Sequence, residues 1–187
     1  QGKRNTNASM VRALAKVLNG MVDEIEKFEP DLVLTGFDIG ANLATTIAAA
    51  HMNIPVAHIQ GGEVSGTIDE SIRHAMSKFA HIHFPATEDA KKRLIRLGEN
   101  PSYIFNVGCP SIDTIVQTPK VHKSILESKF NIDFSKPTIL LIQHPVTTES
   151  NESNKQILNT INAIKELKIQ ALVALPNNDA GSSEIID

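Results

Sequence analysis

Hydrophobic and polar residues alternate along the chain with two different periods. Between residues 10 and 28, apolar residues recur every three or four positions, which predicts an amphipathic helix that ends before Pro30. The run 31–36 that follows is short and apolar and ends in glycine, as buried strands often do. Both patterns are repeated over the rest of the chain.

Strand-like and helix-like segments continue to alternate after residue 36. Short apolar runs predict strands at residues 54–59, 81–84, 104–107, 138–142 and 171–175. Apolar spacing and capping residues predict helices at 41–52, 70–79 (capped by Asp69), 88–97 (capped by Thr87), 111–116, within 119–134 and at 157–167, with a loop over 147–154. This alternation is typical of α/β proteins, in which right-handed crossovers join parallel strands.

Composition excludes several classes of function. The formal net charge of −3 and the lack of a Lys/Arg cluster argue against nucleic acid as a partner. No apolar run approaches the roughly 18 residues that span a bilayer, and the polar start has no signal-peptide pattern, so we expect a cytoplasmic protein with no membrane partner. The single cysteine, Cys109, excludes an internal disulfide framework. The chain begins with Gln1 instead of Met, which indicates a piece of a longer protein.

Polar residues directly follow several predicted strands. In parallel α/β folds, ligands bind outside the carboxyl ends of the strands, so chemistry is expected at these positions. The polar or small residues there are Asp38, His58, Gln60, Gly61, Gly62, Glu63, Gly108, Cys109, His144, Asn177, Asn178 and Asp179. Unpaired polar groups at buried strand ends cost free energy, which makes this concentration informative.

Several of these positions allow both a structural and a functional interpretation. Gly61 and Gly62 either form a tight turn or let the backbone approach a ligand closely. Glu63 and Asp69 can form an acid/base pair, although Asp69 is also well suited to capping a helix. Arg73 is either the i,i+4 partner of Asp69 or an anion ligand beside the site.

Histidines offer a further candidate but no metal site. His144 follows an apolar strand and precedes Pro145, which holds it in an extended conformation at the expected site. The spacing of His58, His81 and His83 matches no metal-site template, so we expect no metal. The chain has neither a G-x-G-x-x-G sequence nor a Walker loop, which argues against a dinucleotide cofactor and a P-loop.

Four motifs in order resemble one enzyme family. Residues 58–78, HIQGGEVSGTIDESIRHAMSK, closely resemble the hydrolysing UDP-N-acetylglucosamine 2-epimerases, which include the epimerase half of the bifunctional enzyme that starts sialic acid synthesis. Residues 108–111 (GCPS), 143–148 (QHPVTT) and 176–182 (PNNDAGS) match the same family in the same order. The resemblance extends from about residue 11 to the end of the chain.

The resemblance implies a fold and a reaction. The fold is the GT-B arrangement of two Rossmann-like domains, with 1–118 as the C-terminal part of the first and 119–187 as the start of the second. The reaction converts UDP-N-acetylglucosamine and water to N-acetylmannosamine and UDP, through elimination of UDP and rehydration of a glucal. It needs no cofactor. The full-length protein is expected to be a homo-oligomer. The 187 residues alone are expected to be inactive, because the family's first strand, its nucleotide-binding Arg loop and its diphosphate loop are missing.

The resemblance also assigns roles to individual residues. Asp38 and Asp69 match the catalytic carboxylates, and His144 matches a histidine near the diphosphate. The positions that match the sugar pocket or the cleft of the second domain are Gln60, Gly61, Gly62, Glu63, Arg73, His74, Asn177 and Asp179.

Two positions depart from the family pattern. Gln60 stands where many relatives have a catalytic Glu, and Ile39 stands where an Arg commonly contacts UDP. We hypothesise that Glu63 takes over the missing carboxylate role. The alternatives are the same chemistry on a UDP-2,4-diacetamido-2,4,6-trideoxyhexose, a non-hydrolysing epimerase, a non-catalytic sugar-nucleotide-binding relative and, less favoured, a GT-B glycosyltransferase.

Overall fold

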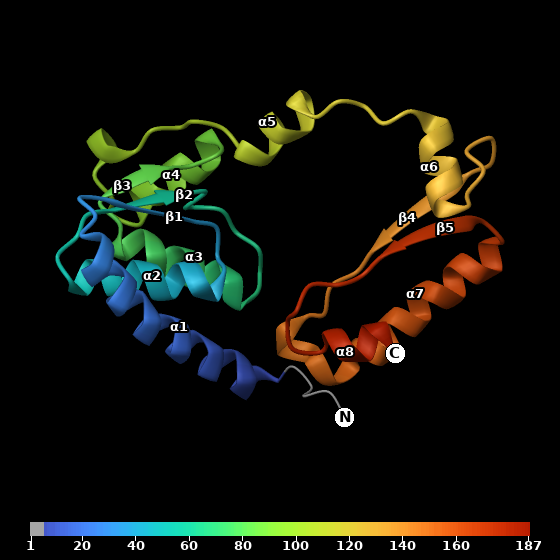
Figure 1. The fold of residues 1–187 in the computed structure, drawn as a ribbon, viewed down its shortest axis with the longest axis horizontal. Coiled ribbons are helices and arrows are strands. Elements are labelled where there is room, and N and C mark those ends of the chain that lie inside the picture. The colour runs from blue at the N-terminus through green and yellow to red at the C-terminus, as the bar shows by residue number, and fades with distance from the viewer. Residues whose placement is uncertain (1–5) are drawn as a thin grey trace. The chain divides into compact units, whose positions relative to one another are not determined.

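The computed structural model describes residues 6–187, which divide into two compact units. Residues Val11–Val116 form the first unit. Gln117–Asp187, together with residues 6–10, belong to the second. Each unit contains its own parallel sheet, with helices in the connections between strands (Figure 1).

The first unit is built on a three-stranded parallel sheet. Its strands β1 (Val33–Gly36), β2 (Val56–Ile59) and β3 (Ile82–Phe84) lie in the order β1-β2-β3. Its helices are α1 (Asn7–Phe28), α2 (Gly40–His51), α3 (Ile68–Phe79), α4 (Glu88–Arg96) and α5 (Pro110–Gln117), with a short 3-10 helix at Pro101–Tyr103. In Figure 1, α1, α2 and α3 lie on the same side of the sheet.

Small residues bring the helices close to the sheet of the first unit. Ala48 and Ala49 of α2 are buried against Val56 of β2 and Ile25 of α1. Alanine combines high helix propensity with little volume, so α2 can pack closely between α1 and the strands. This packing holds the C-terminal half of α2 against α1 and β2.

The caps of α3 and α4 follow from residues just before each helix. Thr87 caps α4 as expected, since its hydroxyl accepts the N–H of Ala90 at 3.1 Å. The prediction that Asp69 caps α3 was wrong. Thr67 has the extended backbone of an N-cap and accepts the N–H of Asp69 at 3.3 Å, so Asp69 lies in the first turn.

The predicted strand 104–107 is only an isolated bridge. Ile104 pairs with His83, and the N–H groups of Phe105 and Val107 donate to the carbonyls of His83 and Pro85. A parallel ladder also needs an N–H from the position of Pro85, which proline lacks. The ladder therefore ends as β3 ends.

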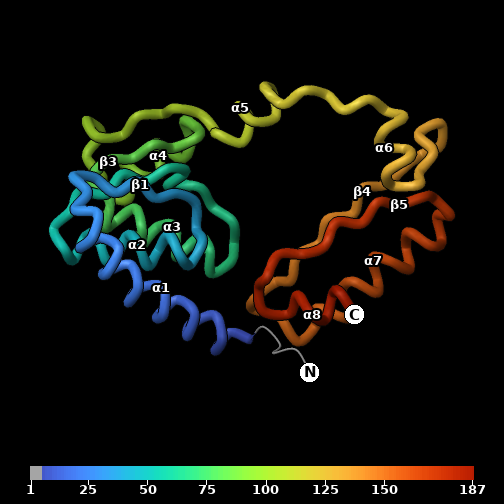
Figure 2. The backbone as a smooth tube through the Cα atoms, viewed as in Figure 1, coloured from blue at the N-terminus to red at the C-terminus, as the bar shows by residue number. Residues whose placement is uncertain are grey.

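The second unit has a two-stranded parallel sheet. β4 (Thr138–Ile142) and β5 (Gln170–Ala174) run side by side along their whole length (Figure 2). Its helices are α6 (Lys123–Phe130), α7 (Ser153–Leu167) and α8 (Ser182–Ile186). The expected loop 147–154 is wrong, because Thr147–Glu152 forms a 3-10 helix and α7 already begins at Ser153.

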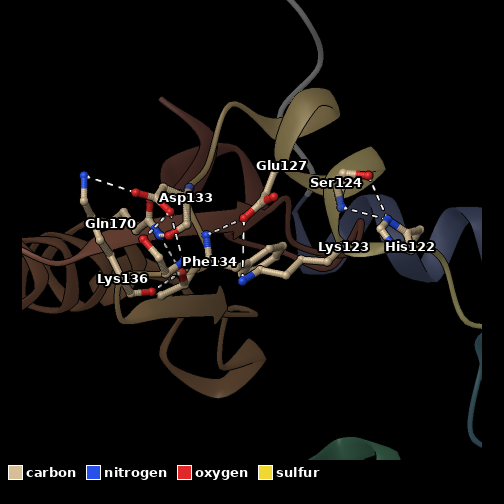
Figure 3. A network of polar contacts seen from close by, with 10 residues as sticks. His122, Lys123, Ser124, Glu127, Asp133, Phe134, Lys136 and Gln170 are labelled. Atoms are coloured by element: carbon tan, nitrogen blue, oxygen red, sulfur yellow. Dashed lines mark hydrogen bonds and ion pairs between the residues drawn. The ribbon is translucent and has the colours of Figure 1, made fainter.

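A polar network ties the connection before β4 to β5 (Figure 3). The amide of Gln170 accepts the N–H of Asp133 at 3.0 Å and donates to the hydroxyl of Thr138 at 2.6 Å. Glu127 of α6 accepts the N–H of Phe134 at 3.0 Å. The network satisfies backbone groups that the short sheet leaves unpaired.

Candidate functional site

The turn after β1 presents a carboxylate to a buried guanidinium. Asp38 forms an ion pair with Arg73 of α3. The other arm of Arg73 donates to the backbone carbonyl of Glu63 at 3.0 Å. The side chain of Arg73 is only 11% exposed and that of Asp38 is 26% exposed. One guanidinium therefore joins the end of β1 to the loop that follows β2.

This geometry decides between the two interpretations of Arg73. Arg73 pairs with Asp38, 35 residues earlier in the sequence, and not with Asp69 one helical turn away. The carboxylate of Asp69 instead accepts the hydroxyl of Thr67 at 3.1 Å. A fully buried carboxylate would be shielded from a ligand. Asp38 and Asp69 are both partly exposed at the carboxyl end of the sheet.

The two glycines after Gln60 are required by packing. A Cβ on Gly61 would lie 2.9 Å from both the Nδ1 of His58 and the Oγ of Ser77. Gly62 has φ +83°, and its carbonyl accepts a hydrogen bond from Arg93. Close approach and a left-handed backbone thus explain both residues without a ligand.

Glu63 and Asp69 contact different groups in the structure. The carboxylate of Glu63 accepts the hydroxyl of Thr87 at 3.2 Å, at the start of α4. Its backbone carbonyl, not its side chain, contacts Arg73. Since Asp69 contacts Thr67, the direct contacts of the two carboxylates do not join them into a pair.

Glu70 holds the loop that carries Glu63, a role that sequence reasoning missed. Its carboxylate accepts the N–H groups of Ser65 at 3.0 Å and Gly66 at 2.9 Å. These hydrogen bonds, the one from Gly66 first, lower the pKa of Glu70. The signal was present, because Thr67 followed three residues later by Glu70 is a capping-box pattern. The Nε2 of His74 lies 3.9 Å from Glu70.

Gln60 has an unexpected sulfur partner. Its backbone has φ +59°, and its side-chain amide donates to the Sγ of Cys109 at 2.9 Å. Hydrogen bonds, led by the N–H of Ser111, lower the pKa of the Cys109 thiol. Cys109 therefore contacts Gln60, the position at which the resemblance implies a catalytic Glu.

His58 belongs to β2 and is fully buried. Its Nδ1 is 3.1 Å from the hydroxyl of Ser77, and its Nε2 is 3.3 Å from the carbonyl of Phe37. Burial is the main cause that lowers the pKa of His58 from 6.5 to about 4. The ring is therefore neutral at physiological pH.

The buried imidazole predicts a loss of stability in acid. The unfolded chain binds a proton at His58 near pH 6.5, whereas the folded protein binds it only near pH 4. The neutral His58 therefore stabilises the fold above pH 6.5, and the free energy of unfolding should fall by about 3 kcal/mol as the pH drops from 6.5 to 4. Urea unfolding of the full-length protein at several pH values tests this. The His58→Gln variant should lack this component, and equal pH dependence in both proteins would contradict the prediction.

The second unit brings three of the predicted site residues together. The Nδ1 of His144, after β4, accepts the N–H of Asn177, after β5, at 3.0 Å. Asn177 donates to the carboxylate of Asp179 at 2.6 Å. An Nδ1 that accepts leaves the proton of the neutral imidazole on Nε2, and His144 is exposed. This imidazole can therefore donate a hydrogen bond to a ligand.

Residues 6–187 contain neither a cluster suited to a metal ion nor a helix suited to a membrane. Within this range, no group of three or more His, Cys, Asp and Glu side chains is placed to hold a metal ion. None of the helices described is long and apolar enough to cross a membrane.

Comparison with known proteins gives the family. The family model described as UDP-N-acetylglucosamine 2-epimerase matches residues 3–187. The chain belongs to this family. The resemblance in the four motifs is thereby confirmed over nearly all of the sequence.

Relatives and solved structures agree with this membership. The chain is 42% identical over 175 residues to a UDP-N,N'-diacetylbacillosamine 2-epimerase (hydrolyzing) of Legionella pneumophila, covering 94% of the chain and 46% of that protein. It is 34% identical to a UDP-N-acetylglucosamine 2-epimerase of Neisseria meningitidis, covering 86% and 42%. The chain thus spans about half the length of these relatives.

The fold comparison confirms the expected fold class. The UDP-GlcNAc 2-epimerase of Methanocaldococcus jannaschii, solved with UDP-GlcNAc and UDP, matches with a TM-score of 0.76 and 20% identity, covering 92% of the chain and 49% of that protein. The α/β fold with parallel Rossmann-like sheets is therefore that of the epimerase family, whose architecture is GT-B.

Proposed function

We propose that the full-length protein is a hydrolysing UDP-sugar 2-epimerase. The observation that carries the proposal is the ion pair of Asp38 with the buried Arg73, at the carboxyl end of the sheet, in a chain of this family. An anionic carboxylate held at a strand end suits a reaction in which positive charge develops on a sugar ring. The family resemblance supplies the order of bond changes.

The C2 proton of the substrate is not activated by a carbonyl, so cleavage of the C1–O bond must lead. UDP leaves with the bonding electrons, a carboxylate takes the C2 proton, and a 2-acetamidoglucal results. Water then adds its hydroxyl at C1, while a proton returns to C2 on the opposite face. We assign charge stabilisation and proton transfer to Asp38 and Asp69.

The leaving diphosphate needs hydrogen-bond donors or positive charge. The exposed His144 offers an Nε2–H donor, because its Nδ1 is occupied by the N–H of Asn177. We assign His144 to the diphosphate and Arg73 with His74 to the sugar pocket, together with Gln60 and the Gly61–Gly62 backbone. Within the second unit, we assign Asn177 and Asp179 to substrate binding beside His144, because the N–H of Asn177 orients the ring and Asp179 holds the Asn177 side chain.

The substrate is a UDP-linked 2-acetamido sugar. We place a UDP-2,4-diacetamido-2,4,6-trideoxyhexose first, because the 42% identical relative is named for UDP-N,N'-diacetylbacillosamine. UDP-N-acetylglucosamine is the second candidate, since the relative with that name is 34% identical. The two substrates differ at C4 and C6, away from the C1 and C2 atoms that react.

The test is an assay of the full-length protein with both UDP-sugars. Release of free sugar together with UDP supports hydrolysing epimerisation, and the larger kcat/KM identifies the substrate. Formation of an epimeric UDP-sugar would instead identify a non-hydrolysing enzyme. Binding of UDP without turnover of either substrate would support a non-catalytic binding protein.

Glu63→Gln tests whether Glu63 replaces the carboxylate missing at Gln60. We expect kcat to fall by about 10²-fold, because an amide cannot accept the proton. The protein should stay folded, since an amide can still accept the hydroxyl of Thr87. Glu88→Gln, at an exposed site in the neighbouring helix, is the matched control. Unchanged turnover in Glu63→Gln would remove Glu63 from the catalytic groups.

A further inference from the structure

The turn between β1 and Asp38 has an unusual backbone. Phe37 has φ +64°, in the left-handed region that residues other than glycine rarely adopt. Its N–H donates to the carbonyl of Ile59 at 3.1 Å, and its carbonyl faces the Nε2 of His58 at 3.3 Å. Such a conformation persists where surrounding contacts hold it, and these two contacts come from one strand, β2.

The opposite edge of the His58 ring faces α3. Its Nδ1 lies 3.1 Å from the Oγ of Ser77, which also lies 3.1 Å from the carbonyl of Arg73. One imidazole thus contacts both the residue before Asp38 and the helix that carries the partner of Asp38. Gly61 packs onto the same pair, because a Cβ there would approach Nδ1 and Oγ to 2.9 Å.

We propose that His58 is a positioning residue that fixes Asp38 against Arg73, acting as a neutral imidazole with its proton on Nε2. A carbonyl oxygen can only accept, so the Phe37 carbonyl requires the proton on Nε2. Nδ1 then accepts from the hydroxyl of Ser77, whose single proton lies within reach of both Nδ1 and the Arg73 carbonyl. Burial, which lowers the pKa of His58 to about 4, keeps the ring in this neutral form.

His58 does not touch the reacting atoms in this role. Its Nε2–H sets the left-handed turn at Phe37, which places Asp38 against Arg73. Its contact with Ser77 of α3 orients the ring for that hydrogen bond. The inference rests on the proposed function only for the rate that the pair controls, because the geometry can be measured without turnover.

Two amides of different length separate the roles of the two ring nitrogens. In His58→Gln, the amide nitrogen reaches the former place of Nε2 and can still donate to the Phe37 carbonyl. In His58→Asn, the amide reaches only the place of Nδ1 and can contact Ser77 alone. Asn is smaller than Gln and leaves a larger cavity at this buried position, so the geometry of the Phe37 turn, and not the loss of stability, separates positioning from packing.

We expect kcat of the full-length enzyme to fall about 10²-fold in His58→Asn but to stay within about threefold of the wild type in His58→Gln, because a misplacement of 1 Å costs about that much. Crystal structures of the two variants should show the Phe37 turn and the Asp38–Arg73 pair kept in Gln and lost in Asn. An intact turn and pair in His58→Asn, or equal loss of kcat in both variants, would overturn the inference. A wild type without turnover would refute the proposed function alone, and the crystal structures would still decide the role of His58.

Discussion

Asp38→Asn should lower kcat of the full-length enzyme by about 10³-fold. The asparagine keeps the shape of Asp38 but carries no charge, so it neither stabilises a positive sugar ring nor accepts a proton. It also leaves the guanidinium of Arg73, 11% exposed, without its anionic partner. We expect a fall in the free energy of unfolding of about 2 kcal/mol, measured by urea denaturation alongside steady-state kinetics.

A double variant separates lost chemistry from lost stability. Asp38→Asn combined with Arg73→Gln removes the unpaired buried charge and should recover part of the lost stability. It should recover none of the lost kcat. Asp31→Asn, at an exposed position just before β1, controls for the change in net charge. A kcat for Asp38→Asn within threefold of the wild type would exclude Asp38 from the chemistry.

Gly62→Ala should be the most destabilising single substitution in the loop after β2. A Cβ at this position would overlap the backbone carbonyl of Ala90 and lie 3.0 Å from the Cγ of Leu94. Backbone atoms of α4 cannot move aside as a flexible side chain does. Strain at φ +83° adds to the overlap, so we expect the free energy of unfolding to fall by about 3–5 kcal/mol.

Gly66→Ala is the matched control for Gly62→Ala. Gly66 also has a left-handed backbone, with φ +71°, but nothing lies within 4 Å of the position of its Cβ. Only the backbone strain remains, and the expected loss is about 1 kcal/mol. Urea unfolding of both variants gives the comparison. Equal losses would show that close packing of Gly62 against α4 is not the cause.

The apolar pattern predicted the strand 138–142 with its observed bounds, because the apolar run coincides with the length that pairs with β5. The strand at 104–107 failed because its pairing depends on another segment, in which Pro85 has no N–H to donate. Local pattern does not contain such partner requirements.

The candidate site shows the same division between local and distant causes. The positions of Asp38 and His144 at strand ends followed from the sequence, because the carboxyl ends of parallel strands gather polar residues. The pairing of Asp38 with Arg73 did not follow, since it depends on how α3 packs on the sheet. The structural reason for Gly61 likewise became visible only with His58 and Ser77 in place.

The source of the hydrogen at C2 of the product, substrate or solvent, tests the central claim most directly. The full-length protein is incubated with the UDP-2,4-diacetamido sugar, and in parallel with UDP-N-acetylglucosamine, in D2O, and the products are analysed by NMR and mass spectrometry. Elimination and rehydration predict UDP and a free sugar that is inverted at C2 and carries one deuterium there. A free or UDP-linked sugar that keeps its original hydrogen at C2 would contradict removal of that proton by the Asp38 site.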